Sequence, residues 1–246
     1  MAITTTALIT ETSTSNFQTW TTSSFTPTSG AILVVAHFGS LLSGAITWGI
    51  TDSESLTWNV IDTTTQTNVT GACQARAWWT HITAGSPPAM TVSIEMNAVT
   101  NHEPGTIVWE WTGTINTSSP IAQTGDAIKD EASPPDTNDS HTTATLGALS
   151  EAAVAAFFLQ VPSTGTRTWD AAPTDWTRLQ DDTGYWTMTC LNEADNTTET
   201  SCTQGRGGTG ESYAWHSFIV EPNASGPAGG IVIPRTSPAR AHILTR

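Results

Sequence analysis

The sequence is short of charged residues, and above all of cations. Charged side chains make up 12% of its 246 residues, whereas soluble domains usually contain about 25%. Lys and Arg together number eight against 22 Asp and Glu, which gives a net charge of −14. Proteins bind a phosphate backbone through Lys and Arg, so this balance argues against nucleic acid as a partner.

Cysteines and long apolar runs are also scarce. Three cysteines, Cys73, Cys190 and Cys202, are too few for a disulfide framework in a chain of this length. Cys190 and Cys202 could face each other across a hairpin, and the sequence leaves both a disulfide and two reduced thiols open. No apolar run is long enough to span a membrane as a helix, so no membrane partner is expected. The opening "MAITTTALITETSTS" lacks a basic segment followed by an apolar run, which predicts no signal peptide.

Thr and Ser are abundant in place of charged residues, and they alternate with apolar residues at a period of two. This pattern, together with the β-branched shape of Thr, is typical of strands with one solvated face. Segments rich in Gly, Pro, Asn and Asp separate the alternating runs, as turns would. The predicted strands are residues 31–38, 76–83, 91–96, 106–112, 152–160, 185–192, 199–204 and 213–220.

The two sets of strands resemble each other. "SGAILVVAHF" has a counterpart in "LSEAAVAAFFL", "SLTWNV" in "PTDWTRL", and "GTIVWEWTG" in "ESYAWHSFIVE". These matches predict an all-β chain whose halves, about 25–125 and 140–221, close into one two-sheet antiparallel, jelly-roll-like sandwich over 25–221. Two independent small sandwiches remain the alternative. Residues 1–24 are expected to be an N-terminal segment, and residues 222–246 a Gly/Pro-hinged C-terminal arm.

Four segments carry a family resemblance: "SGAILVVAHFGS", "TDSESLTWNVI", "RAWWTHITAGSPPAMTVSIEM" and "IVWEWTGTINTSSPIAQTG". They resemble a β-sandwich that recurs among structural proteins of tailed bacteriophages, and the resemblance covers roughly residues 25–220. It implies a virion component, either a head decoration (cement) or minor capsid protein or a collar, tail or fibre accessory protein. Such a protein would be assembled in the host cytoplasm with other virion proteins and copies of itself. The resemblance transfers no catalytic residue.

The titratable residues form no recognisable catalytic or metal-binding motif, so no enzyme activity, metal or cofactor is expected. His81 and His216 lie on predicted strands among aromatic residues, where a structural imidazole is the usual role. Glu95 and Glu110 alternate against apolar neighbours and should point to solvent. They are the pair that a jelly-roll glycosidase would need. The loop acids are expected to be solvated rather than to bind calcium: Asp52, Glu54, Asp181, Asp182, Glu193 and Asp195.

Eleven tryptophans provide the main alternative function. Trp78 and Trp79 are adjacent on a strand and must face opposite ways, while Trp109 and Trp111 share one face. Outward-facing rings would form a platform for sugars, as in a carbohydrate-binding module that attaches to a host surface glycan. Inward-facing rings would fill the core or a subunit interface. Both readings stay open at this stage.

The C-terminal arm differs from the rest of the chain in charge. Residues 1–221 hold five Lys and Arg against 22 Asp and Glu, a net −17, whereas the residues after Glu221 carry three Arg and no acid. Pro234 and Pro238 favour an extended conformation. An extended, apolar and basic segment suits docking on an acidic protein surface. The candidate docking residues are Ile231, Val232, Ile233, Arg235, Arg240, Ile243, Leu244 and Arg246.

Overall fold

The fold consists of strands and their connections, as the sequence predicted. The computed structural model describes residues 2–13, 15, 17–40, 47–61, 66–67, 73–97, 104–130, 140–162, 167–183, 188–208 and 212–225. Every regular element in these ranges is a β-strand, and the ladders between strands are antiparallel. The all-β, sandwich-type fold class is therefore confirmed.

The first half of the chain forms one large and one small sheet. In spatial order the first large sheet contains β1 (Thr4–Thr12), β9 (Pro104–Thr112), β3 (Ile32–Ser40), β7 (Cys73–His81) and β5 (Asn59–Val60), and β6 (Gln66–Thr67) also pairs with β7. The first small sheet contains β2 (Thr19–Thr21), β8 (Val92–Asn97) and β4 (Thr47–Asp52).

The second half repeats this arrangement. The second large sheet contains β10 (Ile121–Asp130), β17 (Ser212–Pro222), β12 (Ala155–Pro162), β15 (Met188–Ala194) and β14 (Trp176–Thr183). The second small sheet contains β11 (Ser140–Thr142), β16 (Thr203–Gly208) and β13 (Arg167–Trp169). Strand for strand, the order matches that of the first half.

In both halves the chain alternates between the large and the small sheet in the manner of a jelly roll. The first strand of each half pairs with its last, and the last pairs with the third strand at the centre of the large sheet. The second, fourth and penultimate strands make the small sheet. Because both halves follow this path between two sheets, each half is a jelly roll.

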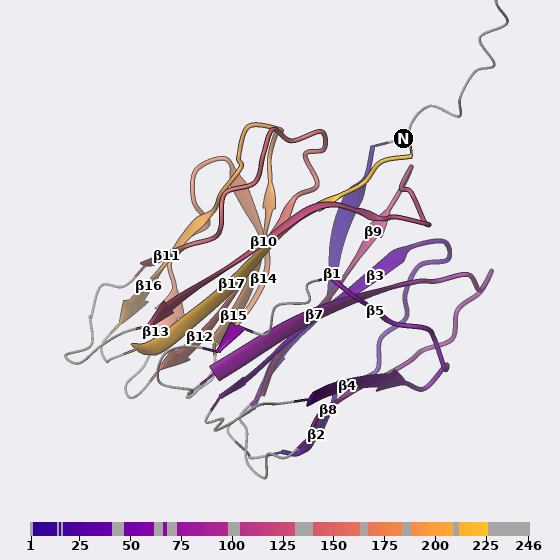
Figure 1. Cartoon of the computed structure of the whole chain (residues 1–246), viewed down its shortest axis with the longest axis horizontal. Helices are drawn as coiled ribbons and strands as arrows, with labels where there is room; N and C mark the ends of the chain where they lie inside the picture. The colour runs from indigo at the N-terminus through magenta and orange to yellow at the C-terminus, as the bar shows by residue number, and fades with distance from the viewer. Residues whose placement is uncertain are drawn as a thin grey trace, which may run out of the picture.

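The two jelly rolls pack through their large sheets, so the molecule has four layers: small, large, large, small (Figure 1). The two large sheets, with the core that the halves share between them, form the two-sheet sandwich expected from the sequence. Each half also has a small sheet and a core of its own, which the sequence did not predict. The alternating pattern did not identify β4, β13 and β14, because these strands are short or poor in apolar residues. In addition, β1 lies within residues 1–24, which were expected to precede the sandwich.

Three cores follow from these layers. The central core lies between the large sheets, and the first and second outer cores lie under the small sheets. Strand β3 belongs to two of them: Ile32, Val34, Ala36 and Phe38 face the central core, whereas Leu33 and Val35 face the first outer core. A strand covered on both faces needs apolar residues at every position, which explains the uninterrupted run "AILVVA".

Aromatic rings join the two halves across the central core. The ring centroid of Trp109 lies 5.2 Å from that of Phe157, and Phe157 stacks on Phe218 at 4.8 Å. Gly105 permits the close approach of the sheets, because a Cβ added there would come within 2.8 Å of the methyl carbon of Thr189. At the edge of the interface, the Thr12 hydroxyl donates to the Asp182 carboxylate at 3.0 Å.

The predicted strand 199–204 is largely wrong. Strand β16 begins only at Thr203, and a turn comes before it. There the Asn196 side chain accepts hydrogen bonds from the backbone N–H and the hydroxyl of Thr198, at 2.8 and 2.6 Å. Such side-chain turns compete with strand formation. The other seven predicted strands each overlap a strand of the structure.

Because the halves share the central core, Phe157→Ala should destabilise both together. Removal of a buried phenylalanine ring typically lowers the free energy of unfolding by about 3–5 kcal/mol. Urea unfolding followed by circular dichroism and tryptophan fluorescence should show one shifted transition. Thr51→Ala, at an exposed position, is the control and should change stability by less than about 0.5 kcal/mol. Two separate transitions would contradict a shared core.

Candidate functional site

The candidate aromatic platform lies mainly inside the molecule. Trp109 and Trp111 do share a face, but that face is the central core, where both rings are fully buried 6.0 Å apart. Trp78 is buried in the first outer core. Trp79 is half-buried against the central core and is the only one of the four with appreciable exposed surface. The rings of Trp78, Trp109 and Trp111 are buried and offer no platform to a dissolved sugar, so these three stabilise the fold.

The two glutamates of the hypothetical glycosidase do not form a pair. Glu95 is exposed on the first small sheet. Glu110 was expected to face solvent, yet it is only 4% exposed. Its carboxylate accepts hydrogen bonds from the backbone N–H and the hydroxyl of Thr28, at 2.7 and 2.6 Å. The loop that leads into β3 covers Glu110, and strand alternation alone could not reveal that cover.

The second half also contains a buried glutamate that accepts hydrogen bonds from a loop. Glu221, at the end of β17, accepts hydrogen bonds from the hydroxyl of Ser150 at 2.9 Å and the backbone N–H of Glu151 at 3.1 Å. Gln123 donates to its other carboxylate oxygen at 2.7 Å. In each jelly roll, then, a buried glutamate on the last strand holds the loop before the central strand. Glu110 and Glu221 are loop anchors.

Other titratable side chains also have structural partners. His216 is buried and stacks on Phe218 at 4.7 Å, as expected for a structural imidazole. His141 and Ser217 lie within hydrogen-bond distance, 2.9 Å, but both are buried and no substrate could reach them. Across the described ranges no group of three or more His, Cys, Asp and Glu side chains could hold a metal ion. Among the same residues no helix is long and apolar enough to cross a membrane.

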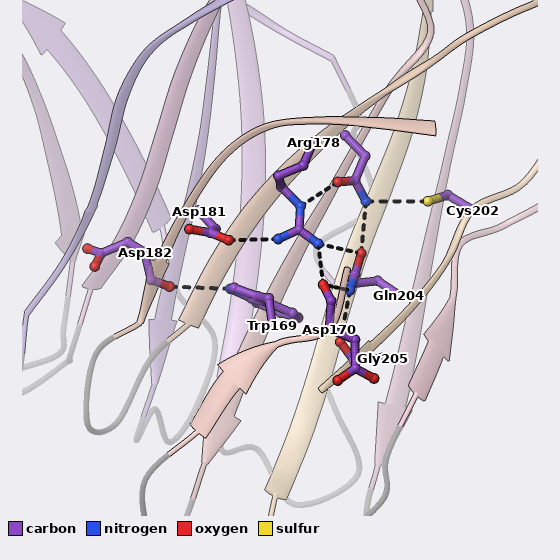
Figure 2. A network of polar contacts seen from close by, with 9 residues as sticks. Trp169, Asp170, Arg178, Asp181, Asp182, Cys202, Gln204 and Gly205 are labelled. Atoms are coloured by element: carbon purple, nitrogen blue, oxygen red, sulfur yellow. Dashed lines mark hydrogen bonds and ion pairs between the residues drawn. The ribbon is translucent and has the colours of Figure 1, made fainter. Parts of the chain in front are cut away.

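A polar network fastens the small sheet of the second half to its large sheet (Figure 2). Arg178 on β14 donates from Nε to Asn192 at 2.7 Å, and from Nη2 to Gln204 at 2.8 Å and the carbonyl oxygen of Asp170 at 2.9 Å. Nη1 pairs with Asp181 at 2.7 Å. Gln204 in turn donates to the carbonyl oxygens of Asp170 and Gly205. The guanidinium thus joins β14, β15, β16 and the end of β13.

The loop acids serve the fold in a similar way. Asp52 accepts hydrogen bonds from the backbone N–H of Glu54 at 2.7 Å, from that of Leu56 at 3.1 Å and from the indole of Trp58 at 2.7 Å. Asp195 accepts from the Thr177 hydroxyl at 2.6 Å. The motif Asp-Ser-Glu-Ser-Leu-Thr-Trp could have predicted the first of these turns, because aspartate often bonds to the backbone two residues on.

Cys190 and Cys202 are both buried free thiols, so the hairpin disulfide did not form. Burial raises the pKa of the Cys202 thiol to about 12, although the hydrogen bond from Asn192 opposes the shift. Burial also raises the pKa of Cys190, well above the ordinary range. Thiols held in the neutral form react poorly, which suits a packing role.

The structure is hollowed at one end of the first half, between the β4–β5 loop and the β7–β8 loop. An apolar hollow of about 120 Å³ is lined by Pro27, Glu54, Leu56, Ile82, Thr83, Ala84, Pro87, Pro88 and Met90. A polar hollow of about 360 Å³ is lined by Ser55, Leu56, Thr57, Asn59, Thr80, His81 and Thr83. The two share Leu56 and Thr83. We refer to them together as the loop groove.

The C-terminal arm begins close to this end of the molecule. Residues 222–225, assigned to the arm from the sequence, are still held by the body: Ala224 pairs with Ile115, and Ser225 donates its N–H to the carbonyl oxygen of Thr114 at 3.0 Å. The candidate docking residues of the arm, from Ile231 to Arg246, lie outside the described residues.

Replacing Arg178 by Met should destabilise the protein by about 2–4 kcal/mol, because two buried acceptors, the side-chain oxygens of Asn192 and Gln204, would lose this donor. Asp181→Asn is the matched control: the Asp181 side chain is 45% exposed, against 17% for Arg178. Loss of an exposed ion pair should cost less than about 1 kcal/mol. Urea denaturation measures both. Equal losses would mean that the ion pair, and not the buried network, carries the stability.

The buried thiols predict a stability that falls in alkali. The unfolded chain ionises its cysteines above their ordinary pKa of 9.0, whereas Cys202 keeps its proton until about pH 12 when folded. Between these values each such thiol favours the unfolded state by about 1.4 kcal/mol per pH unit. Cys202→Ala should remove its share of this slope in urea titrations between pH 9 and 11. An unchanged slope would contradict a buried neutral thiol.

No protein-family model, curated protein or solved structure matches this chain. Function must therefore be inferred from the residues and their geometry.

Proposed function

We propose that the chain is a non-enzymatic structural component of a tailed-phage virion. Its most fitting place is on the capsid, as a decoration (cement) or minor capsid protein that docks through its C-terminal arm. The observation that carries the proposal is the pair of jelly rolls in one chain, since jelly rolls occur in viral capsid proteins. The fold supports this role by analogy, and the resemblance of residues 25–220 to phage structural proteins points the same way.

The polar interior supports a structural role. Glu110, Glu221 and Arg178 each hold loops or sheets through several hydrogen bonds. The buried pair His141 and Ser217 is closed to substrates. In the described part of the chain, the polar groups that an enzyme would converge on a cleft are used instead to fasten one layer to the next.

The charge distribution supports docking through the arm. The body of the protein carries a net −17, and the three cations after Glu221 are the arginines of the arm. Such a body repels other acidic surfaces, whereas a basic, apolar arm can attach to them. The expected partners are other virion proteins and copies of this chain. Attachment to the collar, tail or fibre is the alternative location, and copy number per purified particle separates it from the capsid.

Deletion of residues 227–246 should abolish incorporation into particles and leave the fold intact. All three cores lie before residue 226, so the thermal unfolding midpoint should remain that of the whole chain. Mass spectrometry of purified particles measures incorporation. If the truncated protein enters particles at the normal copy number, the arm is not the means of docking.

A further inference from the structure

The apolar part of the loop groove has the chemistry to hold a short apolar segment next to a cation. Leu56, Ile82, Pro87 and Met90 line the hollow, and the acidic side chain of Glu54 lies among them. Glu54 is exposed and borders the hollow, and no cation lines it. Apolar walls with one acid fit a peptide in which a basic residue follows aliphatic ones.

The groove is a feature of the first jelly roll. The loops around it are held to each other, since the Ser53 N–H donates to the carbonyl oxygen of Thr91 and the Thr91 N–H donates to the Ser53 hydroxyl oxygen, both at 3.2 Å. In the second jelly roll the corresponding loops β13–β14 and β15–β16 are also joined, because the Asp195 N–H donates to the carbonyl oxygen of Asp175 at 2.9 Å. The two halves have the same strand order. In both halves hydrogen bonds hold these loops together, so the hollow of the first half lies between loops that are fixed in place.

The C-terminal arm has the complementary sequence. Ile231, Val232 and Ile233 are followed by Pro234 and Arg235. Proline keeps such a segment extended, so little conformational entropy is lost when it docks. The three aliphatic residues suit the apolar walls of the hollow. Arg235, which follows them closely in the sequence, has the charge opposite to that of Glu54.

The reach of the arm extends beyond its own body. The 21 residues after Ser225 span up to about 70 Å when extended. The arm leaves beside Thr114, at the same end of the first large sheet as the groove, since Trp111 and His81 both lie opposite Ile32 of β3. The groove and the root of the arm thus lie at the same end of the first large sheet.

We propose that the apolar hollow of the loop groove binds the segment Ile231–Arg235 of a second copy of this chain. The inference rests on the proposed function, in which the arm links subunits. Two acidic bodies repel each other, and the arm supplies the apolar and cationic surface that allows them to associate. Arm and groove are different surfaces, so each copy gives one arm and receives another, which generates a ring or an open chain.

Sedimentation velocity of the full chain and of charge-reversal variants, over a range of concentrations, tests this proposal. Wild type should self-associate. Glu54→Arg and Arg235→Glu should each weaken association by roughly three- to tenfold, and the double variant should recover it. Ile231→Asp, in a segment outside all three cores, should weaken it by more than about tenfold without affecting the fold. Glu95→Arg is the matched control, since it changes the charge equally on an exposed strand away from the groove.

The outcomes are distinct. A full chain that stays monomeric at all concentrations overturns the proposal, and so does a double variant that fails to recover. If the chain stays monomeric while the Ile231–Arg235 segment cross-links to its own groove, the arm closes on its own body instead. Particle incorporation then separates the two proposals. If Glu54→Arg enters particles normally and still needs the arm, the protein docks on the virion but the groove is not the receptor of the arm. If the wild type self-associates but does not enter particles, the groove binds the arm but the proposed virion role is rejected.

Discussion

Trp109, Phe157 and Phe218 pack against one another between the two large sheets, and both jelly rolls depend on that contact. Each large sheet has one face under its own small sheet and the other against its partner. A half on its own would expose the inner face of β3, β9 and β7, a contiguous apolar area of the kind that soluble proteins do not leave uncovered. The four-layer arrangement is the solution to that constraint, and it gives the two halves a shared core.

Polar groups are placed where this layered packing leaves loops and sheet edges to be fastened. Glu110 and Glu221 occupy equivalent places at the ends of β9 and β17, and each captures the backbone of the loop before a central strand. Arg178 fastens the second small sheet, and Asp52 holds the β4–β5 loop in the first half. These residue types would suggest catalysis in a sequence. Their partners show that they stabilise the fold.

The two halves share one strand order, and the loop groove lies at one end of the first half. Its loops are held together by hydrogen bonds between Ser53 and Thr91, and they enclose a hollow with aliphatic walls and Glu54. An acidic body with one such hollow and a basic, apolar arm has the two parts of a self-complementary contact. This pairing of hollow and arm, more than the jelly rolls themselves, suggests how copies of the chain could be joined.

The sequence by itself determined the main strands and the similarity of the two halves. The period of two and the turn residues place β3, β7, β9, β12 and β17, because both are local properties of the chain. Only the tertiary structure decided which faces are buried. Glu95 and Glu110 have the same alternating pattern, yet one is exposed and the other buried, because a loop distant in sequence covers Glu110. For the same reason, Trp109 and Trp111 could be placed on one face by their spacing, but whether that face met water or a second sheet depended on contacts between residues far apart in the chain.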